Sequence, residues 1–392
     1  MEVPNSNSDV YPDAGSAGGE RRYPLEFTAT AGEYFRIWIV NLALTIITLG
    51  IYSAWAKVRK KRYFYGHTKI DGEGFEYRAN PIAILKGRII AVGLLAIYTL
   101  TGRFETDLHY VLMAVLLFAI PWLVVRSFAF NAHNTAHRNI RLRFDGTYGG
   151  TFRIVAVPGV LVILAAAPLY FGRFHPDMLK TLVNLALLPM LGIGILYPLI
   201  KARLVKFVLG HHYYGATQFK MELSEYAFYK VFFAAVGIGF LLIILAGVLF
   251  GVVAAITTGA TKGAAAGAHP VIGMAIFFVL IVIYGGYLLL FTYWSVRTTN
   301  LMWGAVGIGP IRLESTLRAR ELAWLYLSNI VAVIFTLGLA TPWAVVRTMR
   351  YRAAKMMLIT TGELSGFITA ESAQVSAVGE EVGEMFDIDI GL

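Results

Sequence analysis

Residues 231–256 read VFFAAVGIGFLLIILAGVLFGVVAAI, a stretch that contains no charged side chain. As one α-helix it is long enough to cross the hydrocarbon core of a bilayer, which requires about 20 predominantly apolar residues. Seven further stretches of the chain have the same character. The sequence therefore predicts an all-α integral membrane protein with about eight transmembrane helices in a pseudo-repeat bundle. The predicted spans are residues 34–55, 82–101, 108–125, 154–171, 181–200, 231–256, 271–296 and 322–346.

The composition of the whole chain supports this class. Of 392 residues, 57% are hydrophobic and only 15% are charged, whereas charged residues make up about a quarter of a soluble protein. The absence of cysteine excludes disulfides, thiolate metal sites and cysteine nucleophiles. The net charge of +10 comes from residues between the apolar stretches. We therefore expect anionic lipid headgroups as partners, and not nucleic acid, while protein partners stay open.

The distribution of Lys and Arg predicts the orientation, because cytoplasmic loops are enriched in these residues. With the N-terminus in the cytoplasm, the outside loops contain only four of the 34 basic residues, namely Arg103, Arg173, Lys180 and Lys262. An even number of spans then places the C-terminus in the cytoplasm as well. The prediction is a multi-pass protein of a bacterial inner membrane with both termini in the cytoplasm.

Two tails flank a predicted membrane domain of residues 25–367. Residues 1–24 are rich in Ser, Asn, Gly, Asp and Pro and have no apolar core, so they predict a disordered tail and not a signal peptide. Residues 368–392 form an acidic C-terminal tail. This tail is either solvated and disordered, or it folds back on the basic cytoplasmic face.

The ends of the predicted helices repeat along the chain. The first copy comprises Asn41, Thr48 to Gly50, Trp55, Arg59 and Arg62. The second copy, offset by 288 residues, comprises Asn329, Thr336 to Gly338, Trp343, Arg347 and Arg350. A polar lead-in at Phe27 also recurs at Phe144 and Phe219. Recurring motifs of this kind indicate a molecule built from related units.

In each copy an aromatic ring is followed by cations. Tyr and Trp prefer headgroup depth and cations reach the phosphates beyond, so the pattern is typical of interfacial anchoring. The alternative is that repeated cations converge on one anion or lipid-headgroup site. The candidates for such a site are Arg59, Arg62, Arg126, Arg347 and Arg350.

Between the helices, residues 65–72 and 214–219 combine aromatic residues, Thr and turn formers. They predict short β-like hairpins or extended loops on the cytoplasmic face. Backbone groups in such segments cannot lie unpaired in lipid, so the loops are expected to stack on one another or to lie in water.

The uncharged polar residues within the predicted spans are few, and the cations Lys86 and Arg88 lie near the cytoplasmic end of the second span, where snorkelling explains them. Asn41, Thr48, Asn329 and Thr336 either form hydrogen bonds between helices or build a pseudo-symmetric polar site. The eight predicted spans contain no Asp or Glu. That absence argues against a relay of buried carboxylates and against ion-coupled transport.

Histidine is the main indication of enzymatic chemistry. His133 and His137 are four residues apart, a spacing that places two imidazoles on one face of a helix. A metal centre needs more ligands than this region offers, and exposed histidines beside the membrane explain the pattern without one. We expect no metal and no other cofactor, assign no catalytic residue, and do not favour an enzyme.

One long motif resembles a known family. EYFRIWIVN at residues 33–41, TLGIYSAWAKVR at 48–59 and RYFYG at 62–66 resemble the signature of the YjgN family, a group of bacterial multi-pass membrane proteins of unknown function. The resemblance covers about residues 25–367. Where the family often has Pro before the Trp, this chain has Ser53-Ala54, although Pro342 precedes Trp343 in the last copy. The resemblance implies an inner-membrane location and no particular activity.

Three function classes remain open at the level of sequence. The first is a transporter or channel-like protein for a neutral, lipid-like or anionic solute, with the cationic helix ends attracting negative groups. The second is a non-catalytic membrane scaffold whose cytoplasmic loops bind partners. The third, less favoured, is an integral-membrane enzyme that modifies lipid.

Overall fold

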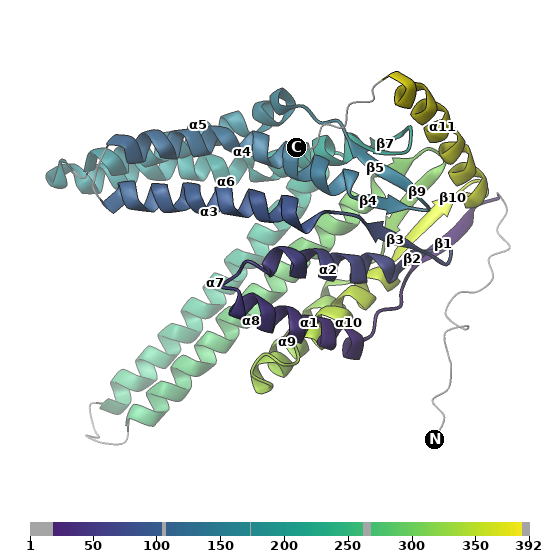
Figure 1. Ribbon diagram of the computed structural model, residues 1–392. Helices are drawn as coiled ribbons and strands as arrows, with labels where there is room; N and C mark the ends of the chain where they lie inside the picture. Colours follow the sequence, from purple (N-terminus) through teal and green to yellow (C-terminus); the bar gives the residue numbers. More distant parts are fainter. Residues whose placement is uncertain (1–18, 104–106, 173, 262–267, 386–392) are drawn as a thin grey trace, which may run out of the picture.

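The computed structural model describes residues 19–103, 107–172, 174–261 and 268–385. Within these ranges, six helices are long and apolar enough to cross a membrane. They form three successive pairs, α3 with α4, α5 with α6, and α7 with α8 (Figure 1). A short 3₁₀ turn, η1 (Pro176–Met178), lies between α5 and α6. The six helices are α3 (Pro81–Arg103), α4 (Asp107–His133), α5 (Tyr148–Gly172), α6 (Leu179–Gly210), α7 (Glu225–Thr261) and α8 (Ala268–Gly304).

The prediction of eight spans is wrong, because the first and last apolar stretches are each a short helical hairpin. The first consists of α1 (Ala31–Ile47) and α2 (Ser53–Gly66), and the last consists of α9 (Ala319–Phe335) and α10 (Thr341–Ala354). The chain reverses at Thr-Leu-Gly in both. Gly50 and Gly338 have a φ of +93°, a left-handed conformation that glycine adopts without strain and that ends a helix.

The prediction of an all-α protein is also wrong, because ten strands form a closed antiparallel barrel in the order β1-β10-β9-β8-β7-β6-β5-β4-β3-β2. Most strands have only three to five residues, too few for a clear alternation of apolar and polar residues. The strands are β1 (Arg21–Phe27), β2 (Thr68–Ile70), β3 (Glu73–Tyr77), β4 (Thr135–His137), β5 (Ile140–Phe144), β6 (His212–Tyr214), β7 (Thr217–Met221), β8 (Val306–Ile308), β9 (Ile311–Ser315) and β10 (Met356–Thr360).

The barrel arranges the molecule as five related units. Four β-hairpins connect successive helix pairs, and the two ends of the chain supply the fifth, in which Arg21 pairs with Thr360 and Pro24 with Met357. β1 also pairs with β2, which closes the barrel. Neighbouring pairs contact each other in the same order, including α10 with α1, so the helix pairs form a ring. The predicted hairpins at residues 65–72 and 214–219 contain the turns β2-β3 and β6-β7.

All helix pairs leave one end of the barrel, and α11 (Leu364–Met385) lies across the other end (Figure 1). Leu364 and Ile368 of α11 pack against barrel side chains such as Ile140, Tyr214 and Leu358. The predicted acidic tail of residues 368–392 therefore includes most of a helix, and residues 386–392 lie outside the described residues. In the predicted N-terminal tail, residues 1–18 also lie outside them, and β1 begins at Arg21.

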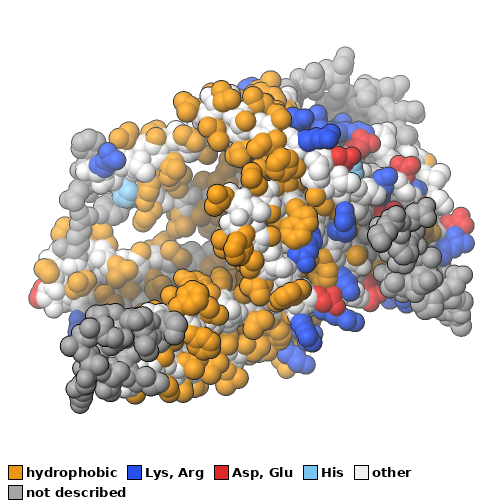
Figure 2. Space-filling model, turned by 90° about the horizontal axis from the view of Figure 1, so that it is seen from below, with side chains coloured by type: hydrophobic (Ala, Val, Ile, Leu, Met, Phe, Trp, Pro, Cys, Tyr) orange, Lys and Arg blue, Asp and Glu red, His pale blue; other side chains and the backbone are white. Residues whose placement is uncertain are grey.

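The surface of the long helices is apolar on all sides. Side chains such as Leu241, Ile243 and Phe277 are mostly exposed, which a water-soluble protein would avoid over so large an area. Figure 2 shows hydrophobic side chains covering the helices, while Lys and Arg gather toward the barrel. The helices therefore have the surface of membrane spans, and the barrel lies outside the hydrocarbon region.

Candidate functional site

The barrel contains an open apolar cavity of about 370 Å³ in the half that faces the helices. Its lining comes from eight elements, namely α2, α8 and the strands β1, β2, β3, β4, β9 and β10. Tyr65 and Trp303, from the last turns of α2 and α8, lie at its helix-facing rim. The six lining strands are consecutive in the barrel, from β9 through β10 and β1 to β4, so the cavity lies against this side of the barrel. Its volume is within the range typical of small-molecule sites.

Strand alternation directs the apolar side chains into this cavity. In β9 the inward Leu313 lines the cavity, while its neighbours Arg312 and Glu314 are exposed. The two threonines of the lining are already satisfied, since Thr68 Oγ1 donates to the carbonyl of Phe64 (2.8 Å) and Thr135 Oγ1 to that of Asn131 (2.7 Å). The cavity therefore suits an apolar group, not an ion.

The other half of the barrel is closed. The buried carboxylate of Glu371 on α11 accepts hydrogen bonds from the backbone N–H groups of Ala216 (2.8 Å) and Thr217 (3.3 Å). The Tyr214 hydroxyl, which donates to the carbonyl of His137 (3.3 Å), has its pKa raised by burial to about 12. A group that enters the cavity from the helices therefore has no open path through the barrel.

Two of the predicted cations bind backbone carbonyls of the next unit. Arg62 Nε donates to the carbonyl of Tyr77 (3.1 Å), just before α3. Arg350 Nη2 donates to the carbonyl of Ala29 (3.0 Å), just before α1. Since α1 follows α10 in the ring, the two arginines hold equivalent junctions. Their contacts are with the protein, and the structure gives them a role in joining units.

The other three predicted cations differ from one another. Arg347 Nη1 donates to the hydroxyl of Ser328 (2.6 Å) and to Asn329 Oδ1 (3.0 Å). Arg126 is exposed, with its Cζ 5.8 Å from the ring centroid of Trp122. Arg59 is exposed and makes no hydrogen bond or ion pair with the described residues. Arg59 and Arg126 are thus the members of the predicted set that present their charge to the surroundings.

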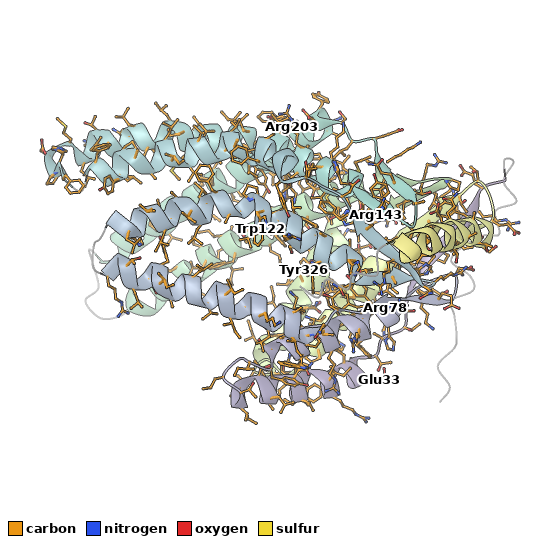
Figure 3. The ribbon with its side chains drawn as sticks, turned by 45° about the horizontal axis from the view of Figure 1, so that its top comes forward. Glu33, Arg78, Trp122, Arg143, Arg203 and Tyr326 are labelled. Atoms are coloured by element: carbon orange, nitrogen blue, oxygen red, sulfur yellow. The ribbon has the colours of Figure 1, made fainter. Side chains whose placement is uncertain are left out.

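Further cations lie at the junction of helices and barrel. Figure 3 shows Arg203 on α6, Arg143 on β5 and Arg78 in the segment between β3 and α3. Arg203 Nε is 3.1 Å from Glu225, and Arg78 Nη2 is 2.6 Å from Glu76. The predicted set of five arginines did not include these residues.

The predicted polar residues of the first and last spans have two different tasks. The hydroxyls of Thr48 and Thr336 lie in the turns of the two hairpins, where each accepts a backbone N–H at 2.9 Å. Asn329 is buried and bonds Arg347. Asn41 is also buried, but its Oδ1 has no hydrogen-bond partner among the described residues.

The two histidines do not share a helix face. His133 is the last residue of α4, with its Nε2 3.2 Å from Arg141 Nη1, whereas His137 lies in β4. Burial is the main reason that the pKa of His137 is lowered, and the neighbouring Arg138 acts in the same direction. In the described ranges no group of three or more His, Cys, Asp or Glu side chains is arranged to hold a metal.

Sequence reasoning missed the cavity residues Tyr65, Trp303 and Leu313. A signal was present in residues 311–315, IRLES, where apolar and charged residues alternate as in a half-buried strand. Trp303 gave no such signal, because it follows an apolar helix in the same way as an interfacial anchor.

Six apolar helices and two short hairpins, set in a ring on a plugged barrel, define a multi-pass membrane protein with a membrane-proximal β-barrel. Residues 22–385 match the family model described as bacterial protein of unknown function DUF898. The chain therefore belongs to the DUF898 family, and the predicted YjgN relationship is confirmed.

The curated relatives agree with this membership. The chain is 24% identical over 344 residues to inner membrane protein YjgN of Salmonella typhimurium, an alignment that covers 84% of this chain and 86% of the relative. It is 24% identical over 206 residues to inner membrane protein YjgN of Escherichia coli O157:H7, covering 50% and 52%. No solved structure matches. Its relatives are thus inner membrane proteins, as expected from the motif.

Proposed function

We propose that this protein is an inner-membrane transporter or channel-like protein for a lipid-like solute whose polar head is neutral or anionic. The observation that carries the proposal is the apolar cavity of about 370 Å³ at the base of the helix ring. The cavity is lined by Trp303, Leu313 and other apolar side chains from one side of the barrel, and Tyr65 and Trp303 place its rim toward the membrane helices.

The surfaces that a solute would contact between the helices are apolar and suit a hydrocarbon chain. Leu364 and Ile368 of α11 help to fill the far half of the barrel, so a path along the axis through the barrel is blocked. The six long apolar stretches contain no Asp or Glu, so they offer no buried carboxylates that could relay protons or cations. A solute that moves here would enter and leave sideways, between helix pairs.

The polar head would lie among the cations at the junction with the barrel. Arg59 and Arg126 are exposed there, and a basic residue near an anionic surface contributes about 1 kcal/mol of attraction. The same excess of Lys and Arg supports a cytoplasmic location for the barrel, and with it for both termini. The cations at this junction would then bind anionic lipid headgroups of the inner leaflet.

Transfer of labelled phospholipids in proteoliposomes tests the proposal. Anionic, zwitterionic and neutral headgroups would be compared by the loss of fluorescence of a headgroup-labelled lipid on addition of an impermeant reductant. Leu313→Trp fills the cavity and should lower transfer several-fold. Glu314→Trp is the matched control, because it places the same side chain on the exposed face of the same strand. No transfer of any headgroup class by the folded wild-type protein would contradict the proposal.

A second candidate is a non-catalytic scaffold, favoured by the closure of the barrel. The carboxylate of Glu371 and the apolar side chains of α11 hold this helix over the barrel end, which presents a fixed surface outside the membrane. In the same experiment, a scaffold predicts that wild type, Leu313→Trp and Glu314→Trp all leave lipid distribution unchanged.

A further inference from the structure

The tips of the two short hairpins are apolar and project away from the rest of the protein. Leu49 and Leu337, at equivalent places in the two turns, are 95% and 94% exposed. Beside them, Ile47 and Phe335 are also largely exposed. Apolar groups on this scale mark a contact surface, and the structure offers the same surface twice.

The backbone of both tips is prepared for an environment without water. Every N–H from Leu49 to Ser53 is bonded within the turn, to Ile46 O, Thr45 O, Thr48 O, Thr48 Oγ1 and Gly50 O in order. Every N–H from Leu337 to Thr341 is bonded in the same pattern. A turn in hydrocarbon must satisfy its backbone internally, whereas a turn in water has no such need.

The occupant of this surface is indicated by what surrounds it. The two hairpins leave the barrel at the same end as the six long apolar helices, so their tips continue the membrane surface (Figure 1). Behind the first tip the rings of Tyr52 and Trp55 stack at 6.2 Å, and Lys57 follows. Behind the second tip the guanidinium of Arg347 lies over the ring of Trp343, with its Cζ 5.0 Å from the ring centroid. Aromatic rings followed by cations are typical of the membrane interface.

The reach of the hairpins is about one leaflet. Lys57 follows Leu49 by eight positions and Arg347 follows Leu337 by ten, which corresponds to about 12 to 15 Å of helix. The hydrocarbon core is about 30 Å thick. A tip at this distance from its cations ends near the middle of the bilayer.

We infer that α1-α2 and α9-α10 are half-depth membrane hairpins, whose tips contact the acyl chains of the leaflet on the barrel side. The ring then has three pairs that cross the whole bilayer and two neighbouring pairs that enter one leaflet only. This inference concerns membrane depth, and its test does not depend on whether the protein transports anything.

Single cysteines test the depth, since the natural chain has none. Leu49→Cys and Leu337→Cys would be treated with a membrane-impermeant maleimide from each side of the membrane. The controls are Asp71→Cys in the β2-β3 turn, Lys180→Cys at the far end of α6, and Ile243→Cys within α7. Both tip cysteines should react less than a tenth as fast as Asp71→Cys or Lys180→Cys, and should resemble Ile243→Cys.

A fluorophore on the same cysteines then measures depth in bilayers of phosphatidylethanolamine and phosphatidylglycerol. Lipids with a nitroxide near the chain end should quench it more strongly than lipids with a nitroxide at the headgroup. Rapid maleimide reaction from the barrel side would show that the tips lie in water, and reaction from the far side would show a complete crossing. Either result overturns the inference. Ile47→Cys and Phe335→Cys provide second positions if a leucine variant does not fold.

Discussion

The first and last helical hairpins share a sequence pattern but use one equivalent pair of arginines, Arg59 and Arg347, differently. In the last hairpin, Arg347 bonds the buried Asn329 at 3.0 Å. In the first hairpin, Asn41 Oδ1 has no partner among the described residues, and Arg59 is exposed. A repeated position therefore does not have a fixed role. One arginine stabilises its own hairpin, while the other presents its charge to the surroundings.

Neighbouring residues explain the difference. Arg347 finds a second acceptor in Ser328, but the first hairpin has Val40 at the equivalent position, which offers no side-chain acceptor. Asn329 Nδ2 donates to Thr348 Oγ1 at 3.0 Å, whereas the first hairpin has Lys60 there. Lys60 has no acceptor atom, so Asn41 lacks the threonine oxygen to which Asn329 donates.

The largest predicted difference between the two hairpins is the loss of stability on removal of Arg347 or Arg59. Arg347→Ala should lower the free energy of unfolding by about 2 kcal/mol, because a charged donor is lost from buried acceptors. Arg59→Ala, an exposed site, should change it by less than about 0.5 kcal/mol. Denaturant unfolding in detergent measures both. Equal losses would mean that the two arginines have the same structural role.

The asparagines give the next largest difference. Asn329→Leu should cost about 1 to 2 kcal/mol of unfolding free energy, since it leaves Arg347 without its Oδ1 acceptor. Asn41→Leu should be neutral or slightly stabilising, because it removes a buried acceptor that has no partner. Thermal unfolding of the two variants beside wild type decides the matter. A greater loss in Asn41→Leu would contradict the comparison.

Substitution of the turn glycines should affect the two hairpins equally. Gly50→Ala and Gly338→Ala should each lower the free energy of unfolding by about 1 kcal/mol, because a Cβ is strained at a φ of +93°. The double variant should lose about twice as much, since the sites are independent. The same unfolding measurement applies, and a clear inequality between the single variants would show that the turns are not equivalent.

The smallest predicted effect is a loss of unfolding free energy in acid, through Glu321 of the last hairpin. Burial opposes the shift, but hydrogen bonds from Tyr351 and Lys355 lower the pKa of Glu321. The lowered carboxyl pKa means that its contribution is present above the unfolded pKa of about 4.5 and is lost as pH falls through the folded value. Because Glu321 is over one third exposed, the contribution should stay below about 1 kcal/mol.

The difference in unfolding free energy between wild type and Glu321→Gln should therefore shrink from pH 6 to pH 3. A difference that grows with acid would have the wrong sign. The first hairpin has His67 in place of Lys355, with its Nε2 4.0 Å from Glu33, so Glu33→Gln provides the matched comparison.

The long apolar stretches could be located from sequence because hydropathy over about 20 residues is a strong signal. The two hairpins could not be told from spans by that average, since Thr48-Leu49-Gly50 adds little polarity to its surroundings. A glycine within each stretch, Gly50 in the first and Gly338 in the last, was the local signal for a turn.

The barrel and the candidate site depended on contacts that sequence spacing does not contain. β1 pairs with β10 across almost the whole chain, and most strands have only three to five residues. Arg62 and Arg350 were identified as repeated residues, but their acceptors, the carbonyls of Tyr77 and Ala29, belong to the next unit of the ring. Their role therefore follows from how the units meet and not from the motif.

Closure of the barrel by the two ends of the chain is the claim on which the ring depends, and one cross-link tests it. In the register of β1 and β10, Arg22 pairs with Ile359, so Arg22→Cys with Ile359→Cys should form an intramolecular disulfide under mild oxidation. Arg22→Cys with Met357→Cys, displaced by two residues, should form it far more slowly. A disulfide that depends on the matched pair supports the closed ring of five units, and no difference between the two pairs would contradict it.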